Sequence, residues 1–251
     1  MAERLAAASG PVIRDHFRTP FAVDQKSDAT PVTIADREAE RVMRELIAEA
    51  FPGHGILGEE HGSERIDAEY VWVLDPIDGT RAFIAGKPIF GTLIALTRNG
   101  APILGVIDQP VNGERWVGAA GRGTTFNGAP VSARPCATLD QAILNTTSPD
   151  LFDGGDRPRF EKIAAASRDV LYGGDCYAYG LLASGFIDLV VEADLKPYDF
   201  CALAPVVNGA GGSITDWRGQ ALTLESDGRI VASGDPALHG QVIETLDFGG
   251  G

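Results

Sequence analysis

The chain has 251 residues, enough to bury a large core as one domain or as two that share an interface. Its 44% hydrophobic and 22% charged residues are typical of a globular protein, and no apolar run approaches the roughly 20 residues that span a bilayer. The net charge of −14 argues against nucleic acid and acidic membranes as partners. It argues against an anionic substrate too, unless bound cations reverse the local field.

The chain opens with two helical patterns. Apolar residues at helical spacing predict a helix over 5–17, bent or interrupted near Pro11. A second helix is predicted over 33–50, because Thr33 and Asp36 match a capping box ahead of an apolar face.

Strand-like runs follow the second helix. They lie at 71–74, 90–97, 102–109 and 114–120. Asn99-Gly100 and Asn112-Gly113 separate the last three runs, and Asn-Gly is a hairpin signal. The first half therefore predicts an antiparallel sheet.

The pattern of predicted elements changes after about residue 125. Short apolar runs at 142–147, 169–174, 186–193 and 229–234 alternate with helical patterns at 159–167, 176–184, 199–212 and 236–246. Such alternation predicts an α/β half with a mixed sheet. We expect halves 1–125 and 126–251 to form one compact unit, with most metal ligands in the first half and the site at their junction.

Three cysteines, Cys136, Cys176 and Cys201, are far apart and in no CxxC pattern. This usage predicts buried, reduced thiols in a cytosolic protein. The first residues also lack the basic and apolar segments of a secretory signal, so a cytoplasmic location is expected.

Acidic residues, and not the four scattered histidines, mark the ends of the predicted elements. Asp75 and Asp78 directly follow the apolar run 71–74, Glu59 follows a shorter one, and Asp199 opens a helical pattern. A carboxylate is costly to place at the end of a buried strand unless something pairs with it. Oxygen ligands of this kind suit a hard cation such as Mg²⁺, which commonly brings phosphate oxygens with it.

Each acid also has a structural explanation. Asp36 can complete the capping box, Asp199 can cap a helix, and Asp78 can belong to an Asp-Gly turn. Glu59 can lie in a solvated loop. Asp75 is harder to explain in this way, because four apolar residues precede it directly.

Gly79 and Thr80 suggest an anion site beside the acids. Glycine allows close backbone approach to a ligand, and a helix that starts here would point free amides at an anion. The acids of the pair are three residues apart, not two as in the DxDx[TV] motif of phosphatases that form an aspartyl-phosphate. We therefore expect attack by water activated by a metal ion.

Four stretches together resemble the inositol monophosphatase-like family of Mg²⁺-dependent phosphomonoesterases. They are "KSDATPVTIAD" (26–36), "GEE" (58–60), "WVLDPIDGT" (72–80) and "KPYDFCAL" (196–203). The resemblance implies a fold of mixed α+β and α/β character, an α/β/α/β/α sandwich, and a homodimer.

The resemblance also implies roles for individual residues. The metal ligands would be Glu59, Asp75, Asp78, Asp199 and the backbone carbonyl of Ile77, holding two or three Mg²⁺ ions, with Mn²⁺ as an alternative. Thr80 and Glu59 would orient the attacking water, Asp36 would support Thr80, and the amides of Gly79 and Thr80 would hold the phosphate. Lys26 would lie at the edge of the site.

Two longer stretches, residues 78–96 and 172–199, look like the histidinol-phosphatase branch of the family. Histidinol phosphate carries an ammonium and an imidazole, so acids suit it. By the resemblance, Asp175, Glu192 and Asp199 would contact this small phosphate monoester, and Arg81 could reach either the phosphate or a neighbouring acid. Two alternatives remain: a broader inositol- or sugar-phosphate monoesterase, and a catalytically silent metal- or phosphate-binding protein.

Overall fold

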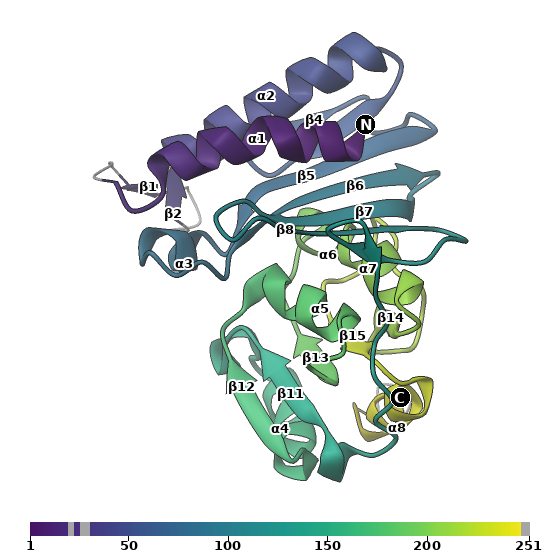
Figure 1. Cartoon of the computed structure of the whole chain (residues 1–251). Coiled ribbons are helices and arrows are strands. Elements are labelled where there is room, and N and C mark those ends of the chain that lie inside the picture. The colour runs from purple at the N-terminus through teal and green to yellow at the C-terminus, as the bar shows by residue number, and fades with distance from the viewer. Residues whose placement is uncertain (20–22, 26–30, 247–251) are drawn as a thin grey trace.

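Two β-sheets alternate with three layers of helices in the computed structural model of the chain (Figure 1). The structure describes residues 1–19, 23–25 and 31–246, so Lys26 lies outside the described residues. The order of the layers is helix, sheet, helix, sheet, helix, which confirms the sandwich expected from the sequence.

The larger sheet has eight strands, and all neighbours but one pair antiparallel. In sheet order they are β10 (Ala129–Pro130), β9 (Thr125–Phe126), β8 (Glu114–Ala119), β7 (Ala101–Gln109), β6 (Gly91–Arg98), β5 (Tyr70–Asp78), β3 (Gly55–Gly58) and β4 (Gly62–Glu64). The exception is the parallel pair β3–β5, in which Gly58 faces Leu74. This pair matters for the site, because parallel strands end at the same edge of a sheet.

Helices α1 (Ala2–His16) and α2 (Ile34–Ala50) pack together over the outer face of this sheet (Figure 1). The capping box of α2 is present, since Thr33 accepts a hydrogen bond from the Ala35 N–H and donates its own N–H to Asp36. Helix α1 continues through Pro11, so the expected interruption there does not occur. A small antiparallel pair, β1 (Val23–Gln25) and β2 (Pro31–Thr33), precedes α2.

The central layer of helices lies between the two sheets. It contains α5 (Asp175–Ala183), α6 (Pro197–Phe200) and α7 (Leu203–Gly209). One apolar cluster joins side chains of the larger sheet, such as Val73, to side chains of the smaller sheet, such as Val190, through these helices. This shared core fixes the position of Asp199 on α6 relative to strand β5.

The smaller sheet is mixed, as expected. Its order is β12 (Asp169–Tyr172), β11 (Ile143–Thr146), β13 (Leu189–Glu192), β15 (Ile230–Ser233) and β14 (Ser213–Asp216). The first three strands are parallel and the last two pair antiparallel. The outer face is covered by α4 (Asp156–Ala166) and α8 (Pro236–Leu246), and two short 3₁₀ turns lie at 139–141 and 149–151.

All three cysteines are buried and free, as the sequence indicated. Within the described part of the chain, no helix is both long enough and apolar enough to cross a membrane.

A buried histidine connects α8 to the smaller sheet. His239 is 8% exposed, and its Nε2 and Nδ1 lie 2.9 Å from Thr215 Oγ1 and 3.0 Å from Ser233 Oγ. Burial lowers the pKa of His239 to about 4, so the imidazole is neutral in the folded protein at neutral pH.

Because His239 is buried in its neutral form, we expect the folded protein to lose stability in weak acid. As the pH falls below about 6.5, the unfolded chain binds a proton that the folded chain takes up only near pH 4. The His239 contribution to the free energy of unfolding should therefore fall by about 2 kcal/mol between pH 7 and pH 5. Urea unfolding of wild type and His239→Gln at both pH values measures it. A stability difference between the two proteins that does not change with pH would contradict this assignment.

Candidate metal centre

Strand β5 brings two carboxylates to one place. Residues three apart on a regular strand point to opposite faces. Here the register with β6 shifts between Asp75 and Asp78, as at a β-bulge, and Asp75 Oδ1 accepts a hydrogen bond from the Ile77 N–H at 3.0 Å. The irregular end of the strand therefore lets the two carboxylates lie close together.

Asp199 completes a cluster of three acids. One carboxylate oxygen from each of Asp75, Asp78 and Asp199 lies within 4.8 Å of the others. Asp199 also caps its own short helix, because its Oδ2 accepts the Lys196 N–H at 2.6 Å. Capping and clustering are thus compatible, and one carboxylate does both.

The cluster is electrostatically unfavourable without a bound cation. Burial, followed by the charges of Glu59 and Asp78, raises the pKa of Asp75 well above its usual value. Burial, followed by the charges of Asp175 and Asp199, raises the pKa of Asp78 in the same way. The pKa of Asp199 rises to about 7, again mainly because the group is buried.

These groups fit a hard divalent cation. Among the described residues, none of the ion pairs with arginine, lysine or histidine includes Asp75, Asp78 or Asp199. Their ligand atoms are all oxygens, which are the donors that Mg²⁺ and Mn²⁺ prefer. A bound cation would supply the positive charge that the side chains do not.

Glu59 lies next to this cluster because β3 and β5 are parallel. It follows the last residue of β3, and its backbone N–H donates to the Leu74 carbonyl at 3.1 Å. Its charge contributes to the raised pKa values of Asp75, Asp199 and Asp36. Asp36 is fully buried in the capping box, and its Oδ1 accepts no hydrogen bond from any described residue.

The turn after β5 is tightly packed. Gly79 has φ +83° and precedes the short helix α3 (Thr80–Ile84). A Cβ on Gly79 would lie 2.8 Å from the carboxylate of Asp175, so only glycine leaves room for that acid. Thr80 Oγ1 donates to the Ile77 carbonyl at 3.1 Å.

A cavity of about 250 Å³ extends from the cluster toward the second half of the chain. The site residues predicted from the sequence that line it are Glu59, Asp78, Gly79, Thr80, Arg81, Asp175, Glu192 and Asp199. Asp36, Asp75 and Ile77 lie behind this surface, in the buried interior. A larger cavity of about 480 Å³ lies near Arg14 and Arg115, but none of the predicted site residues lines it.

Two further acids that line the cavity, Asp175 and Glu192, belong to the second half of the chain. Asp175 begins α5 with φ +44°, and burial, together with the charge of Glu192, raises its pKa to about 7. The charges of Arg81 and Lys87 oppose this rise. Among the described residues no ion pair between Arg81 and an acid is present, so both roles proposed for Arg81 remain predictions.

Three polar contacts in this region were not predicted from the sequence. Tyr179 donates its hydroxyl to Glu192 at 2.8 Å, and Thr147 donates its backbone N–H to the same carboxylate at 3.0 Å. The Cys176 N–H donates to Asp78 at 2.5 Å. The i,i+4 spacing of Asp175 and Tyr179 puts them on one helix face and could have indicated Tyr179. The other two use backbone groups, which carry no signal in the sequence.

Comparisons with known proteins show which proteins this chain is similar to. The Arabidopsis thaliana chloroplastic bifunctional phosphatase IMPL2 is 52% identical over 97% of this chain and 73% of its own length. The histidinol-phosphatase of Chlorobaculum parvum is 36% identical over 93% of this chain and 91% of its own length. The solved structure of an inositol monophosphatase from Zymomonas mobilis superposes with a TM-score of 0.91 and 49% identity, covering 98% of this chain and 96% of that one.

The sequence profile of the inositol monophosphatase family matches residues 1–250, nearly the whole chain. Together with the layered sandwich and the carboxylate cluster at the end of β5, this match means that the chain is a phosphatase of the inositol monophosphatase family.

Proposed function

We propose that this phosphatase hydrolyses L-histidinol phosphate to L-histidinol and inorganic phosphate, with Mg²⁺ as its cofactor. The observation that best supports this substrate is the position of Asp175, whose carboxylate lies directly against Gly79, beside the carboxylate cluster. Glu192 lines the same cavity and acts on Asp175 through its charge. A substrate that carries an ammonium group and an imidazole would balance these two acids, whereas a neutral polyol would not.

Relatives support this substrate and also a broader alternative. Histidinol-phosphatases of Chlorobaculum parvum and Mycobacterium tuberculosis are each 36% identical, over 93% and 90% of this chain. The similarity to the Zymomonas mobilis inositol monophosphatase favours the alternative, an inositol- or sugar-phosphate monoesterase that uses the same catalytic residues.

The proposed metal ligands are Glu59, Asp75, Asp78, Asp199 and the carbonyl of Ile77. When bound, Mg²⁺ would polarise the phosphoryl oxygens, make water a better nucleophile at neutral pH, and neutralise the carboxylate cluster. Two or three ions are expected, with Mn²⁺ as a substitute.

Side chains and amides would then orient the reactants. Because the Thr80 hydroxyl donates a hydrogen bond to the Ile77 carbonyl, its oxygen is left to accept a hydrogen bond from water. Glu59 would accept a hydrogen bond from the second O–H of that water, so that the water presents a lone pair to phosphorus. The amides of Gly79 and Thr80 would hold the phosphate, and Asp36 would keep Thr80 in position from the buried start of α2.

Three broader expectations remain predictions: a homodimer, a cytoplasmic location, and a division into halves at residues 125 and 126. The name of the Arabidopsis relative places that protein in the chloroplast, which differs from the cytoplasmic location expected for this chain.

The substrate proposal predicts a large preference between two phosphate esters. With saturating Mg²⁺, kcat/KM for L-histidinol phosphate should exceed that for myo-inositol 1-phosphate by more than about 10², or about 2.7 kcal/mol of differential transition-state binding. Steady-state phosphate release measures both values. A ratio near one would favour the inositol- or sugar-phosphate monoesterase. No phosphate release from either ester would favour a catalytically silent metal- or phosphate-binding protein.

Asp175→Asn tests whether the charge of Asp175 causes this preference. Asparagine tolerates the left-handed backbone at φ +44°, so the substitution removes the charge with little strain. It should lower kcat/KM for L-histidinol phosphate at least tenfold, or about 1.4 kcal/mol, and change the value for myo-inositol 1-phosphate much less. Equal losses for both esters would show that Asp175 does not set the preference between them.

A second prediction concerns the carboxylate cluster of Asp75, Asp78 and Asp199. Asp75→Asn removes one of several buried acids that repel one another, so it should stabilise the metal-free protein by about 1–3 kcal/mol while abolishing phosphate release. Addition of Mg²⁺ should raise the Tm of wild type but not that of the variant.

Asp108→Asn is the control for the cluster. Asp108 is also buried, but it forms an ion pair with Arg115 at 2.7 Å, so the same substitution should destabilise the protein and preserve the Mg²⁺ response. Thermal unfolding in chelator and in Mg²⁺ compares the three proteins. If Asp75→Asn instead destabilises the metal-free protein as Asp108→Asn does, the repulsion argument is wrong.

A further inference from the structure

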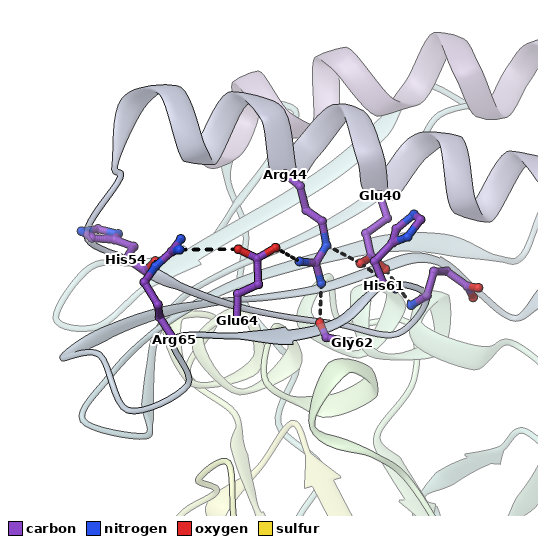
Figure 2. Close-up of polar contacts among 8 residues, drawn as sticks. Glu40, Arg44, His54, His61, Gly62, Glu64 and Arg65 are labelled. Carbon is purple, nitrogen blue, oxygen red and sulfur yellow. Dashed lines mark hydrogen bonds and ion pairs between the residues drawn. The ribbon is translucent and has the colours of Figure 1, made fainter.

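A buried ion pair on α2 lies beside the loop that carries Glu59 (Figure 2). Glu40 is fully buried, and its Oε1 accepts the Nε–H of Arg44 at 2.7 Å, one helical turn further along. Both side chains point from α2 toward the hairpin formed by β3 and β4. Nothing in the proposed chemistry uses either residue directly.

Glu40 binds the backbone that directly follows Glu59. Its Oε2 accepts the Glu60 N–H at 2.7 Å, and its Oε1 accepts the His61 N–H at 3.1 Å. On the other side, the Glu59 N–H donates to Leu74, the residue before Asp75. The peptide units around Glu59 are therefore held from two directions, by strand β5 and by the Glu40 carboxylate.

Arg44 extends this support to the rest of the hairpin. One Nη donates to the Gly62 carbonyl and the other lies 3.2 Å from Glu64 Oε1 (Figure 2). The side chain of Arg44 is 11% exposed and that of Glu40 is fully buried, so their ion pair is shielded from salt, whereas Glu64 is 53% exposed. A planar guanidinium can make all three contacts at once, whereas a lysine ammonium cannot reach them in the same geometry.

The close approach of Glu40 depends on a glycine in β3. A Cβ on Gly58 would lie 2.0 Å from Glu40 Oε1 and 2.8 Å from an Nη of Arg44. The strand therefore has no side chain at the point where the ion pair contacts it, immediately before Glu59.

We infer that Glu40 and Arg44 form a positioning pair that holds Glu59 at the metal site and thereby sets the affinity for the divalent cation. The inference rests on the proposed function, because it takes Glu59 as a metal ligand. The pair acts through the backbone of 59–61 and touches neither substrate nor metal. Its removal should weaken metal binding much more than it slows turnover at saturating metal.

The test compares Mn²⁺ binding and stability in Glu40→Gln and in a matched control, Asp188→Asn. Asp188 is also a buried carboxylate that accepts hydrogen bonds from one arginine, Arg134, and from a backbone N–H, that of Ile143. It lies on the smaller sheet's side of the molecule and does not line the cavity at the acids. Both variants should lose stability, because each leaves an arginine without its carboxylate partner.

The two variants should differ in metal binding. Glu40→Gln should raise the Kd for Mn²⁺ about tenfold, measured by electron paramagnetic resonance of free Mn²⁺, as is typical when a group that orients a metal ligand is removed. The Mg²⁺ concentration for half-maximal phosphate release should rise similarly, while kcat at saturating Mg²⁺ falls less than about threefold. Asp188→Asn should change the Kd less than about twofold.

A second variant covers the case in which Glu40→Gln does not fold. Arg44→Lys keeps the charge beside Glu40 but loses the contacts to the hairpin, so the Kd for Mn²⁺ should rise by a smaller factor. A wild-type Kd in the folded variants, with a Tm lowered as in Asp188→Asn, would show that the pair is only structural. A wild-type protein that binds no Mn²⁺ and releases no phosphate would instead contradict the proposed function, and this inference with it.

Discussion

Several carboxylates lie at one point with no cationic side chain paired to them among the described residues, and the rest of the structure depends on this constraint. Asp75, Asp78 and Asp199 come from a strand and from a helix in different halves of the chain, yet their oxygens lie within 4.8 Å of one another. Burial and the charges of neighbouring acids raise the pKa values of all three. A bound divalent cation would resolve this conflict, and the negative net charge of the protein would then cease to oppose an anionic substrate.

Backbone geometry creates this convergence. The parallel pairing of β3 with β5 puts Glu59 beside the end of β5, and the irregular register after Asp75 turns Asp78 to the same side. The helices between the sheets share one apolar core with both of them, which carries Asp199 to the cluster. The Glu40–Arg44 pair contributes to the same arrangement, because Glu40 holds the backbone that follows Glu59 through the Glu60 and His61 N–H groups.

Local signals in the sequence predicted much of the fold. The capping box of Thr33 and Asp36, the Asn99-Gly100 hairpin and helix α8 are present where the residues predicted them. The parallel position of β3 was not predicted, because four residues carry no information on which strand they pair with. Strand β14 was missed for a similar reason, as its short run follows a glycine-rich turn.

The candidate site was predictable in its residue types and less so in its geometry. Asp75 and Asp78 stood out because charges after an apolar run need a partner, and Glu59 and Asp199 because they lie at the ends of predicted elements. The resemblance added the carbonyl of Ile77. The supporting contacts were not predictable, since the N–H groups of Cys176, Thr147, Glu60 and His61 look like those of any other residue. Their roles depend on tertiary placement alone.

Anomalous diffraction from crystals grown with Mn²⁺ tests the central claim most directly. The account predicts at least one strong anomalous peak among Asp75, Asp78 and Asp199, at roughly 2.2 Å from their carboxylate oxygens. The peak should be absent from crystals of Asp75→Asn. Crystals of active wild-type protein with Mn²⁺ bound elsewhere, or with no peak at the cluster, would contradict the account.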